Sequence, residues 1–351
     1  MDIDFDLLKR ICETPGVPGY EGRIRELVKR EVEPLADEVR VDNMGNLCGF
    51  RKGTGDKKAM VGAHMDEIGF MVNHIDDKGY LRFTTLGGFD PKSLTAQRVI
   101  VHGSEDLVGV MGTKPIHVME EEERKKLPKT KDFFIDLGMS REEVEKKVHI
   151  GAPVSREREL IQMGGCVNGK SIDNRISVYI LIETLKKLKE HPPAHDLYAV
   201  FTVQEEVGIR GASVSSLEIQ PDFGFGLDTT LAFDGPGSQA HEQVTELGKG
   251  AAIKVLDASA ICDPRMVAYL KKVADGHEIP WQSEVLTAGG TDTKGIQQMK
   301  AGGAISGAVS IPTRYLHQVI ESADKQDISH CIELLTQGLL ELDRFEAGSS
   351  G

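Results

Sequence analysis

The stretch DLYAVFTVQEE, residues 196–206, decides the fold class and marks the first candidate site. The segment before the two glutamates is mostly apolar and contains Tyr, Val, Phe and Thr, a pattern typical of a buried central strand. Glu205 and Glu206 end this strand. Ionised carboxylates in such a place are costly unless they are paired, hydrogen-bonded or metal-bound. The pair therefore either begins a solvated loop or belongs to a site where one carboxylate holds a metal and the other moves protons.

Helices and strands alternate around this stretch. Helical spacing of apolar residues predicts helices over residues 4–14, 19–36, 174–191, 264–279, 291–302 and 325–345. Strands are expected over residues 58–72, 197–203, 222–228, 251–257, 283–288 and 303–311, and a hairpin over 37–53. Such alternation predicts an α/β sheet with helices on both faces.

The sequence pattern changes between residues 69 and 163. Short stretches of alternating polar and apolar residues with frequent glycine predict a β-rich module there. A charged segment inside it, residues 119–134, is expected to be a solvated loop or helix face. The simplest organisation is one discontinuous α/β domain, residues 1–68 and 164–351, interrupted by a β-rich domain, residues 69–163. The closing GSSG, residues 348–351, is left out of the fold prediction as a frayed tail.

Composition excludes several classes of protein. The 351-residue chain has a net charge of −13 and no long basic run, so nucleic acid and anionic membrane are not expected partners. The charged first residues lack the apolar core of a signal peptide, and no apolar run reaches the roughly 20 residues needed to cross a bilayer. Five scattered cysteines without CxxC spacing indicate reduced thiols and a cytoplasmic protein.

Acids and histidines gather at the predicted strand ends, which is where functional groups of α/β sheets meet. They are His64, Asp66, Asp173, Glu205, Glu206, Asp228 and His317. Nitrogen and oxygen ligands together suit zinc, cobalt or manganese and not calcium. One carboxylate shared by two cations would give each cation three protein ligands and leave room for a bridging water, which describes a hydrolytic site.

Each member also has an ordinary structural interpretation. His64 could be a core histidine and Asp66 a turn residue, although residues two apart on a strand share a face, so that Asp66 could orient the His64 ring. Asp173 precedes a helical run and could be an N-cap, or the carboxylate that bridges two cations. Asp228 is either a turn former or a ligand, and His317 either a surface histidine or a ligand.

Six motifs together make the chain resemble the TET-type metallo-aminopeptidases, also called deblocking or glutamyl aminopeptidases and sometimes labelled endoglucanases. They are AHMDEIGF (63–70), KSIDNR (170–175), QEEVGIRGA (204–212), GLD (226–228), GGTDT (289–293) and IPTRYLH (311–317). The resemblance covers nearly the whole chain. The fold it implies is a mixed-sheet metallopeptidase domain interrupted by an inserted β-rich dimerisation domain.

The resemblance also implies residue roles. One metal ion would be held by His64 and Asp228 and the other by Glu206 and His317, with Asp173 bridging both. Glu205 would be general base and then acid, and Asp66 would orient His64. The peptide bond between Asp173 and Asn174 is expected to be cis, and Asn174 departs from the aspartate usual in the family. GGTDT is expected to cap the next helix through Thr291 or Asp292, and Arg314 and Tyr315 either to contact substrate or a neighbouring subunit, or to pack.

The implied function is a metal-dependent aminopeptidase that removes the N-terminal residue of peptides through a water bridging two Zn²⁺ or Co²⁺ ions, or Mn²⁺. Its implied partners are peptides and copies of itself, first as a dimer and then as a dodecamer. Three alternatives remain open: a glycoside hydrolase using two carboxyl groups, a catalytically silent metal-binding assembly, and a relative that removes acyl groups from metabolites.

Overall fold

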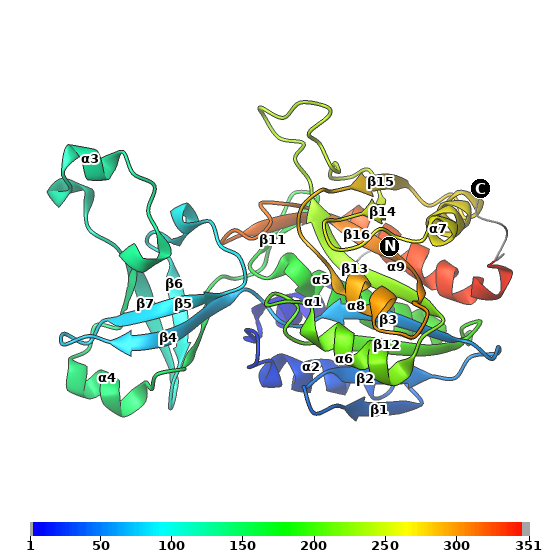
Figure 1. Cartoon of the computed structure of the whole chain (residues 1–351), viewed down its shortest axis with the longest axis horizontal. Helices are drawn as coiled ribbons and strands as arrows, with labels where there is room; N and C mark the ends of the chain where they lie inside the picture. The colour runs from blue at the N-terminus through cyan, green and yellow to red at the C-terminus, as the bar shows by residue number, and fades with distance from the viewer. Residues whose placement is uncertain (1–2, 346–351) are drawn as a thin grey trace.

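The computed structural model describes residues 3–345, and within them a large mixed sheet forms the body of the molecule (Figure 1). Its nine-strand path is β1 (Glu38–Val41), β2 (Leu47–Arg51), β12 (Asp196–Thr202), β3 (Lys58–His64), β13 (Phe223–Leu231), β16 (Ile305–Arg314), β17 (Glu321–Asp324), β11 (Cys166–Gly169) and β10 (Ile161–Met163). Beside this path, β14 (Ala251–Leu256) pairs with β16 and with β15 (Trp281–Val285).

The four central strands, β12, β3, β13 and β16, are parallel to one another. The register places His64 opposite Thr202, and Asp228 opposite Ser310. The carboxyl ends of these strands therefore lie at one edge of the sheet, the place where α/β folds bind ligands. The outer pairs, such as β2 with β12 and β16 with β17, are antiparallel, so the sheet is mixed as expected.

Helices cover both faces of the sheet, as the alternation predicts. The larger apolar core lies under α1 (Phe5–Glu13), α2 (Gly22–Val32), α5 (Ile172–Leu188), α7 (Pro264–Gly276) and α9 (Lys325–Leu340). The opposite face carries α6 (Arg210–Ile219) and α8 (Asp292–Gln298) over a smaller apolar cluster. Nearly every side chain of α5 is buried because this helix is packed between the sheet, α1 and α9. None of the described helices is long and apolar enough to cross a bilayer.

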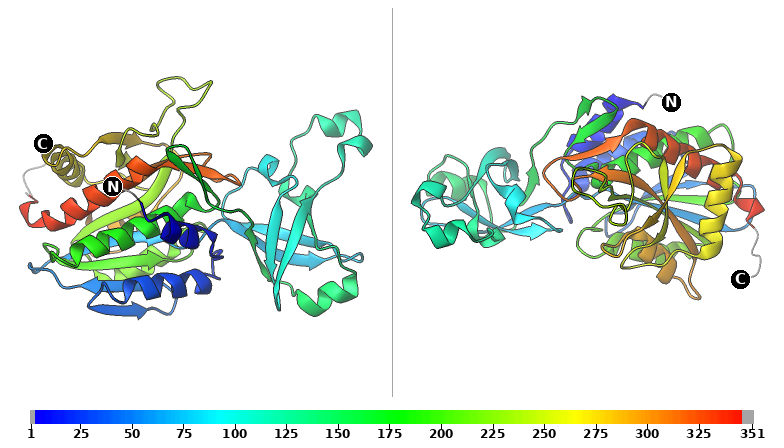
Figure 2. Two further views of the ribbon diagram at one scale, coloured as in Figure 1. Left: turned by 180° about the vertical axis from the view of Figure 1, so that it is seen from behind. Right: turned by 90° about the horizontal axis from the view of Figure 1, so that it is seen from above.

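A six-stranded closed barrel stands apart from the sheet (Figure 2). Its strands, in barrel order, are β4 (Gly69–Ile75), β5 (Leu81–Leu86), β8 (Phe134–Asp136), β7 (Asp106–Gly112), β6 (Arg98–His102) and β9 (Pro153–Arg156). It has its own apolar core and carries α3 (Glu121–Arg124), α4 (Arg141–Lys147), η1 (Pro91–Leu94), η2 (Ile116–Val118) and η3 (Thr130–Asp132). The charged segment 119–134 is half-exposed or exposed except for Phe133, as expected.

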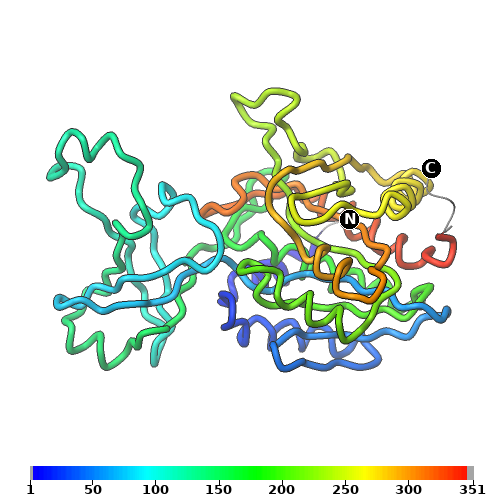
Figure 3. Tube along the Cα trace, viewed as in Figure 1, coloured from blue at the N-terminus to red at the C-terminus, as the bar shows by residue number. Residues whose placement is uncertain are grey.

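The chain passes twice between the two parts, entering the barrel after β3 and leaving it after β9 (Figure 3). The prediction of one strand over residues 58–72 is wrong at this junction. Residues 65–68 are not strand, and they separate β3 of the sheet from β4 of the barrel. Both halves are buried and apolar, so periodicity alone cannot reveal a change of sheet.

Some elements were not predicted: α6, β10, β11, β17 and the terminal η4 (Leu342–Arg344) as a separate turn. The α6 sequence, RGASVSSLEI, is rich in small residues, and its apolar stripe is correspondingly weak. Strand β17 reads ESAD and is a strand only because it pairs with β11 and β16. The excluded tail, residues 348–351, lies outside the described residues.

Candidate metal centre

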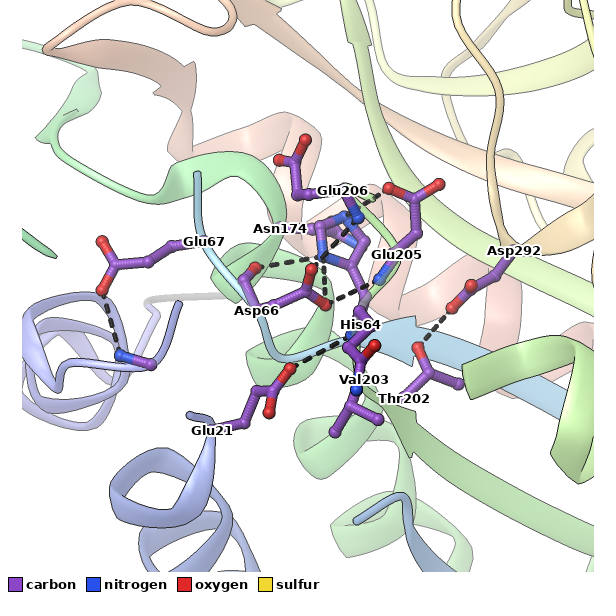
Figure 4. A network of polar contacts seen from close by, with 12 residues as sticks. Glu21, His64, Asp66, Glu67, Asn174, Thr202, Val203, Glu205, Glu206 and Asp292 are labelled. Carbon is purple, nitrogen blue, oxygen red and sulfur yellow. Dashed lines mark hydrogen bonds and ion pairs between the residues drawn. The ribbon is translucent and has the colours of Figure 1, made fainter. Parts of the chain in front are cut away.

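All seven predicted site residues meet at the carboxyl edge of the parallel strands. His64 is the last residue of β3, and Asp228 lies within β13. Glu205 and Glu206 follow β12, with their side chains near His64 in Figure 4. The remaining three lie outside the strands: Asp66 in the segment between β3 and β4, Asp173 at the start of α5 and His317 in the turn between β16 and β17.

Three of these residues form a fully buried group, called here the strand triad: His64, Asp173 and Asp228. His64 Nε2 lies 3.3 Å from Asp173 Oδ1 and 3.7 Å from Asp228 Oδ1. The side chain of His64 is 2% exposed. The paired strands β3 and β13, together with the start of α5, therefore place an imidazole and two carboxylates around one point inside the protein.

Three residues form a second group, called here the loop triad: Asp173, Glu206 and His317. His317 Nε2 lies 3.2 Å from Asp173 Oδ2 and 3.6 Å from Glu206 Oε2. The His317 side chain is 40% exposed, in contrast to that of His64. The two oxygens of Asp173 thus face two different histidines, which is the arrangement a shared carboxylate needs.

The loop that carries Glu205 and Glu206 is held by carboxylates from the N-terminal part of the chain (Figure 4). Asp66 Oδ1 accepts a hydrogen bond from Glu205 N at 3.0 Å, and Asp66 Oδ2 accepts one from Glu206 N at 3.1 Å. Glu21 Oε1 accepts a third from Gln204 N at 3.2 Å. Three consecutive amides are therefore fixed, and the direction of both glutamate side chains follows from this anchoring.

The expected contact between the Asp66 carboxylate and His64 is present, and the Asp66 backbone adds a second, closer one. His64 Nδ1 lies 3.1 Å from the backbone oxygen of Asp66 and 3.5 Å from its Oδ1. Because β3 ends at His64, Asp66 does not continue the strand, and the same-face argument fails there. The backbone carbonyl of Asp66 is the nearer partner of the ring, and the carboxylate both contacts the ring and holds the glutamate loop.

Asp173 is followed by a cis peptide bond to Asn174, as expected. Asn174 Nδ2 donates a hydrogen bond to Leu227 O at 2.9 Å, directly before Asp228. The amide therefore ties the start of α5 to β13, a contact that requires a donor at this position.

The charges of the site are unbalanced without a cation. Burial raises the pKa of Glu205 well above its ordinary value, and burial together with Asp173 raises the pKa of Glu206 to about 8. Burial opposes protonation of His317, but its contacts with Asp173 and Glu206 outweigh this and raise its pKa to about 10. Within residues 3–345, no lysine or arginine lies within ion-pair distance of the carboxylates of either triad.

Two buried carboxylate oxygens of the triads also accept no hydrogen bond from residues 3–345: Asp173 Oδ1 and Glu206 Oε1. Buried polar atoms without partners are rare and need an explanation such as an ion. Nitrogen and carboxylate donors in two groups of three fit two divalent cations of the zinc, cobalt or manganese class. The residues present therefore suit the expected metal pair.

A cleft of about 310 Å³ opens over the triads. Its far wall contains Ile209, Leu286, Leu316 and a buried polar cluster of Lys254, Asp257 and Thr291. No phenylalanine, tyrosine or tryptophan is among the described residues that line it.

Several site neighbours could not be identified from local sequence. Gly88 comes from the barrel side, and a Cβ atom there would lie 3.3 Å from His317 Nδ1. Asp292 is buried and accepts a hydrogen bond from Thr202 Oγ1. Glu321 is buried beside Asp173. The glycine pair after FTTL was a signal for Gly88, because it marks a close approach of the backbone, and the GGTDT motif contained Asp292, which was expected only as a helix cap.

The weaker predictions have mixed outcomes. Thr291 does occupy the N-cap of α8, but its side chain forms no capping bond there and donates to Asp257 Oδ2 at 3.1 Å. Arg314 forms a two-contact ion pair with Asp234, at 2.5 and 2.7 Å, so it packs within its own chain. Tyr315 is 50% exposed.

Comparison with known proteins gives matches over nearly the whole chain. Residues 45–334 match the family model described as M42 glutamyl aminopeptidase. A putative aminopeptidase of Acetivibrio thermocellus is 41% identical over 95% of this chain and 98% of its own length. A lysyl aminopeptidase of Pyrococcus furiosus is 38% identical, with coverage of 97% and 98%. The TET1 peptidase of Pyrococcus horikoshii, described as assembling into a tetrahedron or a large octahedral shell, is 32% identical with a TM-score of 0.87 and coverage of 96% and 99%.

Proposed function

The chain belongs to the M42 glutamyl aminopeptidase family, and on that basis we propose how its site acts as a metal-dependent aminopeptidase. The observation that carries the proposal is that Asp173 belongs to both triads, while Glu205 lies beside them with its Oε2 3.9 Å from His64 Nε2. Two cation sites and a separate proton carrier in one cleft are the components of metal-assisted hydrolysis.

His64, Asp173 and Asp228 would hold one divalent cation, and Asp173, Glu206 and His317 the other. When bound, the ions act as Lewis acids and lower the pKa of water. We propose that both ions are Zn²⁺, Co²⁺ or Mn²⁺, because imidazole and carboxylate ligands suit these metals.

Glu205 would serve first as base and then as acid. It removes a proton from the water whose oxygen attacks the carbonyl carbon of the first peptide bond, and it delivers that proton to the amine nitrogen as the C–N bond breaks. Neither triad includes Glu205, so its carboxylate is free for this task. Asp66 keeps Glu205 in position through the backbone amides of Glu205 and Glu206.

Substrates would be peptides with a free N-terminus. The charged α-amine of such a peptide is attracted by the carboxylates of the cleft, and the attraction selects the first residue over internal ones. This recognition separates an exopeptidase from a general hydrolase.

We also propose that the barrel, within residues 69–163, is a dimerisation domain and that residues 1–68 with 164–351 form the catalytic domain. Two observations support this. Three apolar residues of the barrel are strongly exposed: Ile116 at 61%, Val118 at 62% and Leu127 at 70%. The related TET1 peptidase of Pyrococcus horikoshii is described as assembling into a tetrahedron or a large octahedral shell. Light scattering of the purified protein should give a dimer or, at full assembly, a dodecamer, whereas a monomer mass contradicts the proposal.

The cytoplasm is the proposed location. All five cysteines are unpaired, and four of them are buried. Free buried thiols are ordinary in a reducing compartment. Alkylation of the native protein extracted under non-reducing conditions would check this, because disulfide formation in that sample contradicts it.

The decisive experiment is hydrolysis of a panel of aminoacyl p-nitroanilides and of a soluble cellulose derivative. We expect release of p-nitroaniline, loss of release with a chelator and recovery with Co²⁺ or Zn²⁺. A glycosidase would instead cleave the polysaccharide and survive chelation, but its two carboxyls must flank a sugar roughly 5–9.5 Å apart, and the cleft has no aromatic platform. Metal binding with no hydrolysis of any substrate would indicate a silent assembly, and acyl transfer from N-acyl amino acids alone would indicate an acyl-removing relative.

A further inference from the structure

Glu321, the first residue of β17, connects two of the three residues of the loop triad, His317 and Asp173, through its carboxylate. Its Oε1 accepts a hydrogen bond from His317 N at 3.1 Å, and its Oε2 accepts one from Asp173 N at 3.0 Å. The side chain is fully buried. Both oxygens are therefore engaged, each by the backbone of a different triad residue.

Glu321 is itself well anchored. Its backbone pairs with Gly169 of β11, and its carbonyl oxygen accepts a hydrogen bond from Asn168 Nδ2 at 3.0 Å. A carboxylate on a fixed strand can impose a position on the turn beside it, because a hydrogen bond to a charged acceptor is stronger than a neutral one.

The turn that carries His317 has few other restraints. Tyr315 and His317 both have positive φ, +62° and +57°, in a region that residues other than glycine rarely adopt. Beyond Glu321, the turn is held by Gln318 N, which donates to Tyr315 O at 3.1 Å, and by Arg156, whose Nη1 donates to Gln318 O at 2.5 Å. Neither of these contacts acts on His317 directly.

Asp173 is restrained far more strongly. It is buried at the start of α5, and the next residue, Asn174, is tied to Leu227 O. Removing the Glu321 carboxylate would therefore displace His317 more than Asp173.

We propose that Glu321 is a positioning residue that holds His317 against Asp173 and so gives the loop triad its affinity for a divalent cation. The inference rests on the proposed function, since it assumes that the triads bind cations. It assigns Glu321 no contact with the ion or the substrate. Its consequence is selective: the strand triad, whose three residues Glu321 reaches only at Asp173, keeps its ion.

The test compares Glu321→Gln with a matched control, Asp327→Asn. Asp327 is also fully buried, and its two oxygens also accept hydrogen bonds from two backbone amides, Gly248 N and Gly250 N, both at 2.7 Å. It lies in α9 and touches neither triad. Each substitution keeps the side-chain shape and places an amide NH₂ against a backbone donor, so general destabilisation is matched between the two.

Equilibrium dialysis against buffered Zn²⁺, with zinc per chain measured at each free concentration, gives the binding curves. The native protein should bind two ions. Glu321→Gln should keep one ion at native affinity and bind the second on the order of 10–100-fold more weakly, the effect expected for a lost outer-shell partner. Asp327→Asn should bind both ions as the native protein does, and His317→Ala marks the curve of a chain without the loop triad.

Native binding of both ions by Glu321→Gln would overturn the inference, as would a parallel weakening of both ions or the same selective loss in Asp327→Asn. If Glu321→Gln does not fold, Glu321→Asp is measured in its place. This shorter side chain keeps the charge but loses reach toward one of the two amides, so the second ion should again be weakened selectively. A native protein that binds no zinc would contradict the proposed function itself, which is a separate outcome.

Discussion

The strand triad and the loop triad share Asp173 but are built from different kinds of chain. His64 and Asp228 lie on paired parallel strands in the middle of the sheet. Glu206 and His317 lie on connections after strands and depend on buried carboxylates for their positions. The histidine of the first triad is 2% exposed and that of the second is 40% exposed.

This difference suggests different roles for the two triads: the strand triad is buried, and the loop triad faces the cleft. Two of the three proposed ligands of the first group, His64 and Asp228, are held by the strands themselves, and burial keeps water and competing ligands away. The second group faces the cleft, where a substrate must enter, and its backbone needs carboxylate anchors to reach its position. We expect the first cation site to be tight and slow to exchange, and the second to be weaker and faster.

The largest effect is expected when the residue that both triads share is removed, because the two sites should then be lost together. Asp173→Ala should abolish binding of both ions, because each triad then retains only two ligands. Activity should fall to background. Zinc content after dialysis checks this, with a thermal melt to show that the variant is folded. Retention of both ions would mean that Asp173 does not bridge.

A second substitution leaves both triads intact and removes the proposed proton carrier. Glu205→Gln keeps the shape of the side chain but cannot act as a base, so kcat should fall by a factor on the order of 10²–10⁴. Two ions should remain bound, because Glu205 belongs to neither triad. Steady-state hydrolysis of an aminoacyl p-nitroanilide, together with metal analysis, checks both statements. Near-native turnover would reject Glu205 as the base.

Chelation kinetics sharpen the comparison directly. A dilute chelator should remove the two ions in two phases, and the faster phase should belong to the loop triad because His317 is exposed. In His317→Ala the fast phase should disappear while the slow phase remains. A single phase in the native protein, or a fast phase that survives in His317→Ala, would contradict the assignment.

The pH dependence of stability distinguishes the metal-free from the metal-bound protein. The pKa of His317 is raised from 6.5 to about 10, so its contribution to metal-free stability is complete below 6.5 and is lost as pH rises toward 10. The pKa of Glu206 is raised from 4.5 to about 8, so its protonated form also favours folding at lower pH. Metal-free protein should therefore be less stable at pH 8.5 than at pH 6.5.

Added zinc should oppose this trend, because cations and protons compete for the same ligands and the competition weakens as pH rises. Denaturant unfolding at both pH values, with and without zinc, gives the four free energies needed. A larger stabilisation by zinc at pH 6.5 than at pH 8.5 would contradict this prediction.

The smallest expected effect comes from the barrel side of the loop triad. In Gly88→Ala the new Cβ would lie 3.3 Å from His317 Nδ1, closer than most real contacts, so the ring must shift slightly. The second zinc ion should bind a few-fold more weakly and the first should be unaffected. Gly235→Ala is the control, since a Cβ there meets nothing within 4 Å. Equal zinc curves for the two variants would show that Gly88 does not press on the site.

Much of the architecture could be predicted because the evidence for it is local. A short window of sequence is enough to recognise three features: the apolar strand 197–203, the helix that begins near Asn174, and the frequent glycines of residues 69–163. The strand before Glu205 was expected in the centre of the sheet, and β12 pairs there with β3. The domain boundary was expected between residues 68 and 69, but the end of the strand at His64 was missed, because apolar residues on both sides read as one continuous strand.

The sequence by itself determined which candidate ligands the protein offers and that most of them lie at or near the ends of strands, since residue type and periodicity are local properties. Only the tertiary structure decided that one oxygen of Asp173 faces His64 and the other faces His317. It also placed Glu321 on Asp173, 148 residues away along the chain, and turned the Asp66 carboxylate toward the glutamate loop. Such contacts join distant segments, and their geometry depends on how the strands pair and the helices pack, which no short window of sequence contains.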